Sequence, residues 1–166
     1  MQKANNPKQL WRNLLIPFTL LIIVVVDIFT KNWIRSYPPD GQTIYKLGFL
    51  RIIHITNTGS AFGAFQGYAL ALAIIGIIGL FVLSWLGIFI YRHYPRFVNI
   101  PNRIALGLIL GGDFGNLIDR MRFAGRVTDF IDPGFFPVFN VADSAITIGV
   151  ILVIYAILRE MIRENK

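Results

Sequence analysis

Two aspartates that lie 14 residues apart, Asp129 and Asp143, could form a catalytic pair. The chain between them is long enough to double back and bring the two carboxyl groups together. Two carboxyl groups held a few ångströms apart cannot both ionise cheaply, so such a pair keeps one proton near neutral pH. One member can then act as a general base on water while the other acts as a general acid. The pair therefore predicts the chemistry of aspartic proteolysis.

The stretch FNVADS, residues 139–144, also has a structural interpretation. Asn140 and Asp143 have the spacing of the N-cap and N3 positions of a helix, where they would form a capping box with Asp in place of Glu. On this stretch alone, capping and catalysis are equally well supported, and the preceding Asp129 favours catalysis. Asp132, which precedes Pro and Gly, is interpreted instead as the start of a turn.

A polar stripe is predicted on the helix that contains LGLILGGDFGNLIDRMR, residues 106–122. Asp113, Asn116 and Arg120 stand at i, i+3 and i+7, within about 60° of one another around a helix. Charged residues in a membrane-spanning helix are costly, so this stripe should face protein or water. It would either hold the helices together or support a reacting centre. The glycines at 111, 112 and 115 are expected to permit close helix packing.

Two further polar groups are expected near one membrane boundary. Asp27 and Lys31 are spaced i, i+4, so they would form an ion pair that is either structural or orients a nearby site. NTGSAFG, residues 57–63, favours a turn by its composition, and its backbone amides, next to Asn57, could equally bind an extended peptide.

Other catalytic classes are poorly supplied. The chain has no cysteine, which excludes disulfides, thiol catalysis and thiolate metal sites. His54 and His93 are expected in loops on opposite sides of a membrane and lack a zinc-binding spacing, so we predict no metal and no cofactor. A serine–lysine pair made by Ser60 and Lys31 is a further alternative.

The elements that must position these groups are expected to span a membrane. Of the 166 residues 55% are apolar and only 15% are charged, and residues 55–91 contain no Lys, Arg, Asp, Glu or His. Because about 20 apolar residues cross a bilayer as a helix, we predict an all-α integral membrane protein of one domain, residues 1–166. The predicted transmembrane helices cover residues 14–33, 67–91, 103–120 and 141–158.

The loops between these helices are expected to differ in structure. Residues 43–59 mix β-branched and aromatic residues with partial alternation, which predicts a small β element within the loop 34–66. Residues 121–140 are predicted to form the second loop on the same side. Nine of the 16 Lys and Arg residues lie in the two terminal tails and the segment 91–103, which favours cytoplasmic termini. The β element and both aspartates of the pair would then lie near the extracytoplasmic face.

The net charge of +7 does not predict nucleic-acid binding, because the basic residues lie in small groups between apolar runs. Membrane lipids are the expected neighbours.

Taken together, the polar blocks resemble those of the lipoprotein signal peptidases, also called signal peptidase II. The blocks are Asp27 with Lys31; Asn57, Gly59, Ala61 and Phe62; GGDFGNLIDR; VTDF; and FNVADS. They cover nearly the whole chain, and their order and spacing are highly specific.

The resemblance implies an aspartic endopeptidase of the bacterial cell (inner) membrane, with four transmembrane helices and a small extracytoplasmic β element. Such an enzyme removes signal peptides from prolipoprotein substrates by cutting just before a diacylglyceryl-cysteine, and we expect it to be a monomer. Carried over by motif, Asp129 and Asp143 are the catalytic residues. The positions expected to bind the substrate backbone and orient the carboxylates are Asn57, Asn116, Arg120 and Asn140. Asp27 and Lys31 match a supporting position.

The chain departs from the family pattern in three places. Asp113 stands where a small apolar residue is expected, which adds a further carboxylate to the polar stripe, and Ser60 stands where alanine is common. The segment between the two catalytic aspartates is short, which predicts a reduced loop over the substrate.

Two other functions compete with the peptidase. A small proton-coupled transporter would use acids spread through the bundle as a relay, and its members would be Asp27, Asp113, Arg120 and Asp143. A purely structural assembly partner is the third hypothesis, which the polar residues gathered near the outer boundary disfavour.

Overall fold

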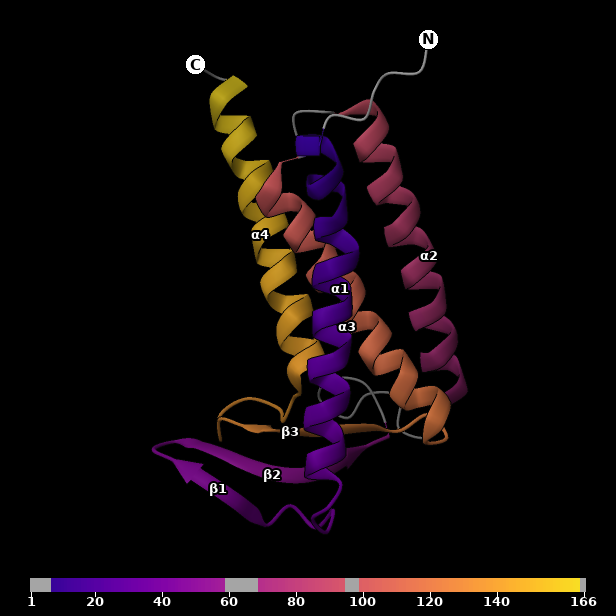
Figure 1. The fold of residues 1–166 in the computed structure, drawn as a ribbon. Coiled ribbons are helices and arrows are strands. Elements are labelled where there is room, and N and C mark those ends of the chain that lie inside the picture. Colours follow the sequence, from indigo (N-terminus) through magenta and orange to yellow (C-terminus); the bar gives the residue numbers. More distant parts are fainter. Residues whose placement is uncertain (1–6, 59–68, 95–98, 165–166) are drawn as a thin grey trace.

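A computed structural model describes residues 7–58, 69–94 and 99–164. Four long helices lie alongside one another, and a small sheet lies across one end of them (Figure 1). The first residues of α1 and the last residues of α4 lie at the opposite end. The prediction of a mostly helical protein with a small β element is confirmed. The four helices are α1 (Pro7–Ile34), α2 (Ala69–His93), α3 (Ile100–Arg122) and α4 (Val141–Glu164).

Local signals determine where α3 begins and ends. Asn99 is its N-cap, and the side chain of Asn99 accepts a hydrogen bond of 3.0 Å from the backbone N–H of Asn102. After Arg122 the backbone enters the left-handed region at Ala124, with φ 52°, and at Gly125, with φ 82°. This turn directs the chain from the end of α3 into the sheet.

Glycines let α3 pack closely against α1 and α4, which is the role predicted for them from the sequence. A Cβ atom on Gly111 would lie 3.0 Å from the carbonyl oxygen of Leu20 in α1, and a Cβ atom on Gly115 would lie 2.6 Å from Oδ2 of Asp27. On another side of α3, a Cβ atom on Gly112 would collide with the carbonyl oxygen of Ala142 in α4. Close approach of this kind is how membrane helices gain contact without a hydrophobic driving force. It also brings polar groups of three helices within hydrogen-bonding distance of each other.

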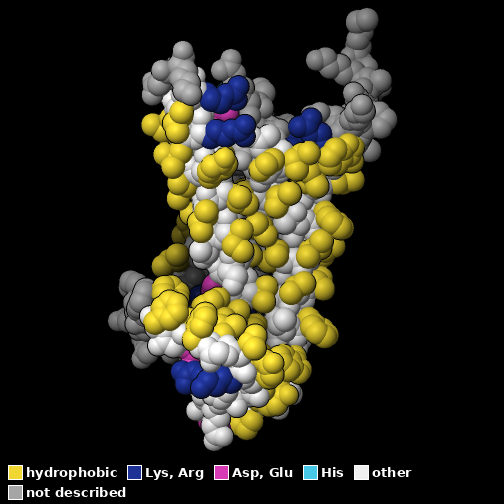
Figure 2. Space-filling model, turned by 90° about the vertical axis from the view of Figure 1, so that its left-hand side faces the viewer, with side chains coloured by type: hydrophobic (Ala, Val, Ile, Leu, Met, Phe, Trp, Pro, Cys, Tyr) yellow, Lys and Arg dark blue, Asp and Glu magenta, His cyan; other side chains and the backbone are white. Residues whose placement is uncertain are grey.

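The helices present apolar side chains outward. Figure 2 shows hydrophobic side chains over the middle of one face, with Lys and Arg gathered near its two ends. Within the described residues, α1 and α4 are long and apolar enough to cross a membrane, and only 11% and 17% of their most apolar windows are buried. α2 contains a shorter apolar stretch, Ile74–Ile90. The count of four spanning helices stays a prediction.

The sheet has three antiparallel strands in the order β1 (Thr43–Leu47), β2 (Leu50–Asn57) and β3 (Val127–Asp132). The expected β element at 43–59 is the β1–β2 hairpin. The loop predicted at residues 121–140 lies between α3 and α4 and contains the strand β3, which was not predicted. This strand was missed because it is six residues long, contains two aspartates and pairs with a strand some 70 residues earlier in the chain.

A bulge in β2 shapes the sheet where it faces the helices. Ile52 pairs with Ile131 and Ile55 pairs with Asp129, so β2 has one more residue than β3 between these two pairs. The extra residue explains why two consecutive β2 side chains, Ile53 and His54, are both buried. Beyond the bulge, Ile55 pairs with Asp129, so the last residues of β2 lie beside the part of β3 that carries this aspartate.

Candidate active site

Asp129 projects from β3 and is held by two asparagine amides. Asn57 at the end of β2 donates its Nδ2 hydrogen to Oδ2 of Asp129 over 2.8 Å. Asn140 donates its Nδ2 hydrogen to Oδ1 over 2.7 Å. Because the carboxyl group is only 3% exposed, these two bonds replace water and determine its orientation.

Asp143 lies in the first turn of α4 and forms the expected capping box with Asn140. The backbone N–H of Asp143 donates to Oδ1 of Asn140 over 2.9 Å, and the backbone N–H of Asn140 donates to Oδ2 of Asp143 over 3.2 Å. The second oxygen of the same carboxyl group, Oδ1, accepts a 2.8 Å hydrogen bond from Nδ2 of Asn116. The two interpretations of FNVADS are therefore compatible, because capping itself points the Asp143 carboxyl group in a defined direction.

The chain doubles back between the two aspartates, as expected. After β3 it turns at Asp132, whose Oδ1 accepts a 2.7 Å bond from the backbone N–H of Gly134, so the predicted turn is present. The chain then returns to pair Phe139 with Ile131. This pairing places Asn140 next to β3 at the start of α4. One side chain, Asn140, consequently contacts both aspartates.

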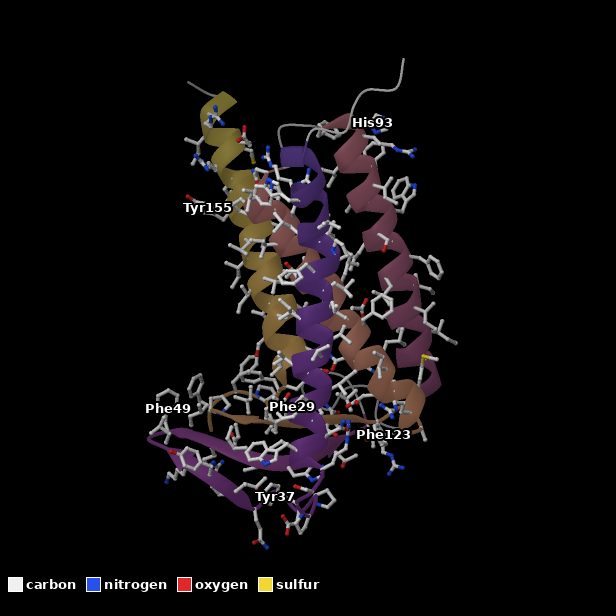
Figure 3. The ribbon with its side chains drawn as sticks, viewed as in Figure 1. Phe29, Tyr37, Phe49, His93, Phe123 and Tyr155 are labelled. Carbon is white, nitrogen blue, oxygen red and sulfur yellow. The ribbon has the colours of Figure 1, made fainter. Side chains whose placement is uncertain are left out.

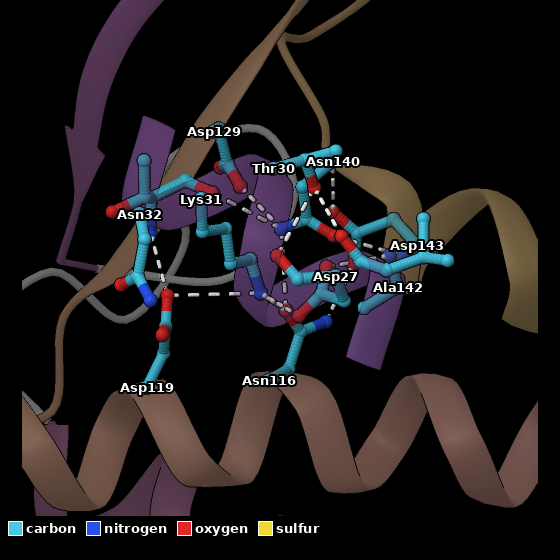
Figure 4. A network of polar contacts seen from close by, with 12 residues as sticks. Asp27, Thr30, Lys31, Asn32, Asn116, Asp119, Asp129, Asn140, Ala142 and Asp143 are labelled. Atoms are coloured by element: carbon cyan, nitrogen blue, oxygen red, sulfur yellow. Dashed lines mark hydrogen bonds and ion pairs between the residues drawn. The ribbon is translucent and has the colours of Figure 1, made fainter. Parts of the chain in front are cut away.

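A buried ion pair lies behind the two aspartates, shown in Figure 4. Lys31 and Asp27, both fully buried in α1, are joined by a 2.7 Å contact between Nζ and Oδ2, the predicted i, i+4 pair. Lys31 Nζ also donates a 2.9 Å hydrogen bond to Oδ1 of Asn116. Asp27 Oδ1 accepts a 3.0 Å bond from the backbone N–H of Ala142 in the first turn of α4. The pair thus connects α1 to α3 and α4.

The electrostatics of the site favour a shared proton. Burial and, after it, the negative charge of Asp143 raise the pKa of Asp129 to about 7. The hydrogen bonds from Asn57 and Asn140 and the charge of Lys31 act in the opposite direction. Near neutral pH, Asp129 therefore holds a proton more readily than an ordinary aspartate does.

Both aspartates line one cavity of about 240 Å³ near the sheet. Its wall also contains polar side chains from β2 and α3, including Asn57 and Arg120. Apolar residues from the segment after β3, including Phe136 and Phe139, complete it. The cavity therefore combines two acids, a cation and an apolar rim, which suits an extended peptide with an apolar neighbour.

Three residues of this region were not predicted. Asp119 accepts a 3.1 Å hydrogen bond from the backbone N–H of Thr128, directly before Asp129, and pairs with Nη2 of Arg35 at 2.5 Å. Arg35 Nε donates a further 2.9 Å bond to Oγ1 of Thr128. Asp119 stands three residues after Asn116 and Arg35 stands four after Lys31, so helical spacing could have indicated both. Their contact with Thr128 depends on the tertiary fold.

Other residues singled out from the sequence lie away from the two aspartates. Asp113 faces α2, where Cβ atoms added to Gly76 and Gly79 would lie 3.6 and 3.4 Å from its carboxyl oxygens. The stripe on α3 therefore divides, since Asn116 and Arg120 reach the cavity. Asp132 forms an ion pair of 2.6 Å with Arg51.

The histidines and the NTGSAFG segment add no reacting group within the described residues. His54 Nδ1 lies 2.6 Å from the carbonyl oxygen of Tyr37, and Tyr37 and His93 lie at opposite ends of the molecule (Figure 3). Among the residues that the structure describes, no group of three His, Cys, Asp or Glu side chains could hold a metal ion. Ser60, and NTGSAFG beyond Thr58, lie outside the described residues.

Known proteins match this chain over most of its length. The family model described as signal peptidase (SPase) II matches residues 19–159. A lipoprotein signal peptidase of Dehalococcoides mccartyi is 44% identical over 128 residues, which cover 77% of this chain and 79% of that protein. A second lipoprotein signal peptidase, from Syntrophomonas wolfei, is 36% identical, with 89% and 95% covered.

A solved bacterial membrane enzyme superposes with a TM-score of 0.75 at 34% identity, covering 87% of each chain. The fold therefore agrees with the sequence matches and indicates a bacterial membrane protein. Since the family model spans most of the chain and the relatives share well over 30% of its residues, this chain belongs to the signal peptidase II family, a family of proteases.

Proposed function

We propose that this chain is an aspartic endopeptidase that removes signal peptides from lipid-modified prolipoproteins, cutting just before the diacylglyceryl-cysteine. The substrate follows from the name of its relatives and from the family to which it belongs. One observation carries the assignment of the catalytic residues. Asp129 and Asp143 are both hydrogen-bonded to Asn140 and line the same cavity. The proton-coupled transporter is not supported by any of these matches.

The reaction would use one proton shared by the two aspartates. The ionised member takes a proton from a water molecule as its oxygen attacks the scissile carbonyl carbon, and the protonated member donates its proton to the carbonyl oxygen. Collapse of the tetrahedral intermediate then breaks the C–N bond. The amine leaves with a proton from one aspartate, while one hydroxyl group of the intermediate returns its proton to the other aspartate as the new carboxyl group forms. Each turnover returns the pair to its starting state with one proton.

The surrounding polar residues would have two separate roles. The side-chain amides of Asn116 and Asn140 donate hydrogen bonds to Asp143 and Asp129, so they would orient the two carboxyl groups. Arg120 also lines the cavity, and none of the described hydrogen bonds joins it to these two amides. Its guanidinium group would therefore bind a carbonyl of the substrate backbone. Asn57 would contribute to both roles, and Asp27 with Lys31 would support the site from behind.

The orientation in the membrane belongs to the same proposal. All four helices would span the bilayer, with both termini in the cytoplasm and the sheet and the two aspartates near the extracytoplasmic face. The larger share of Lys and Arg at the end with the termini supports this orientation. The lipid of the substrate could then stay among acyl chains while its cysteine reaches the aspartates. The chain would act as a monomer among membrane lipids, with no nucleic-acid partner.

The decisive experiment is cleavage of a lipidated precursor by Asp129→Asn and by Asp143→Asn. Each variant is expected to reach the membrane and to lose cleavage, because the pair would then lack its base or its shared proton. Asp40→Asn is the matched control, since Asp40 is an exposed acid before β1 and should leave cleavage unchanged. Normal cleavage by either of the first two variants would eliminate the pair as the catalytic group.

A further inference from the structure

A second cavity lies at the other end of the helices, near the ends of the described chain rather than near the sheet. It has a volume of about 840 Å³ and is lined by the second half of α2, the first half of α3 and the last part of α4, with Ile16 of α1. No lining residue is shared with the cavity that holds Asp129 and Asp143. It therefore does not belong to the candidate active site.

The walls of this cavity are apolar. Leu83 and Ile90 of α2 line it, with Leu106 and Ile109 of α3 and Val153 of α4. From Leu83 to Arg92, α2 alone provides about 14 Å of wall along its axis. A cavity of this size with such walls does not hold ordered water, because water needs polar partners. In a membrane the available apolar filler is an acyl chain.

One end of the cavity is cationic. Arg92 near the end of α2 and Arg103 in the first turn of α3 both line it, and Tyr94 lies beside them. Arg103 is only 4% exposed, and its Nη1 donates a 2.8 Å hydrogen bond to the carbonyl oxygen of Arg12, which holds its guanidinium in place. Arg92 and Arg103, with no Asp or Glu among the described lining residues, match a lipid headgroup with a net negative charge. The choline group of a zwitterionic lipid would instead add a further cation at this end.

We propose that this cavity binds an anionic phospholipid from the leaflet at the end with the termini. Its phosphate contacts Arg92 and Arg103, and one acyl chain runs along α2 and α3 toward Leu83. The chain fills the space that α2, α3 and α4 enclose and so stabilises the position of α2. The site is separate from the proposed peptidase reaction.

Lipid binding tests this inference without measuring cleavage. The purified full-length protein in neutral detergent is mixed with phosphatidylglycerol or phosphatidylcholine, and retained lipid is counted by native mass spectrometry. We expect one phosphatidylglycerol per chain, bound at least tenfold more tightly than phosphatidylcholine. Phosphatidylglycerol should also raise the Tm by about 3 °C or more, because it binds the folded state. Equal retention of the two lipids would overturn the proposal.

Three variants locate the binding site. Arg92→Gln should weaken phosphatidylglycerol binding at least tenfold. Because Arg92 is exposed, this substitution should leave the folded structure unchanged. Ala156→Phe places a ring in the cavity and should displace the acyl chain. Arg159→Gln, an exposed α4 arginine outside the cavity lining, should bind as the unmodified protein does. Full binding by Arg92→Gln or Ala156→Phe, or a loss confined to Arg159→Gln, would place the lipid elsewhere and refute the inference.

Discussion

Lys31 Nζ lies 2.9 Å from Oδ1 of Asn116, so a buried ammonium group on α1, together with a 3.2 Å bond from Nδ2 of Asn140, orients that amide toward Asp143. An ammonium group can only donate, which forces Oδ1 toward Lys31 and leaves Nδ2 to donate to the carboxyl group. Lys31 is therefore a positioning residue that acts on Asp143 through Asn116. The sequence leaves open whether the Asp27–Lys31 pair is structural or orients a nearby site, and this geometry lets it do both.

Removing the ion pair in two steps should separate its two effects. Lys31→Met leaves the buried carboxylate of Asp27 without its cation, which should cost about 3–5 kcal/mol of unfolding free energy. Adding Asp27→Asn should recover much of this stability. Cleavage should nevertheless stay about 100-fold low, because Oδ1 of Asn116 then keeps only the 3.2 Å bond from Asn140 and the amide is held less firmly. Tm and precursor cleavage are measured for both variants. A double variant with the unmodified cleavage rate would show that Lys31 has no orienting role.

Asn140 should be essential for alignment rather than for helix capping. Asn140→Ala loses the cap of α4, at about 1 kcal/mol, together with the bond to Asp129, and cleavage should fall about 100-fold. Asn140→Ser can still cap the helix, but it has no amide to reach Oδ1 of Asp129. We therefore expect Asn140→Ser to have nearly the original Tm and the same low cleavage as Asn140→Ala. If Asn140→Ser restored cleavage as well as Tm, capping alone would explain the residue.

The contacts around Thr128 should hold β3 against the helices. Thr128→Val keeps the shape of the side chain but removes the oxygen that accepts from Arg35, at about 1 kcal/mol. Amide hydrogen exchange in β3 should accelerate, and cleavage should fall several-fold because Asp129 is the next residue. Thr43→Val on exposed β1 is the matched control and should change neither measurement. Unchanged exchange in residues 127–132 would contradict this role.

The pH dependence of cleavage should report the pKa of Asp129. Because burial raises this pKa to about 7, the shared proton is lost as the pH rises through about 7, and kcat/KM should fall over that range. The hydrogen bond from Asn57 lowers the pKa by favouring the ionised form. Asn57→Ala should therefore move the fall in kcat/KM to higher pH, besides reducing its maximum. A shift to lower pH would mean that the observed proton does not belong to Asp129.

Interactions between residues close in the chain could be predicted from the sequence. The Asp27–Lys31 pair forms across one helical turn, and the Asn140–Asp143 box forms at the first turn of a helix. The turn after Asp132 is made by a hydrogen bond between residues only two apart. In each case the backbone geometry of one element decides which side chains meet. The same is true of the long apolar runs that become helices.

Interactions that join distant elements could not be predicted in this way. The stripe of Asp113, Asn116 and Arg120 was expected to act together, but Asp113 faces α2 while the other two face the cavity, because α3 is surrounded by neighbours. Asp119 was overlooked because its partners, Arg35 and Thr128, come from the turn after α1 and from β3.

By itself, the sequence determined that this chain forms long apolar helices and carries two aspartates with the residue types that can align them. Local spacing and hydrophobicity are sufficient for those properties, and the motif order is sufficient for the family. The tertiary structure decided which oxygen each amide contacts, which acids remain outside the site, and where the two cavities lie. These outcomes depend on how closely the glycines let α3 approach its neighbours, and only the packed helices determine that distance.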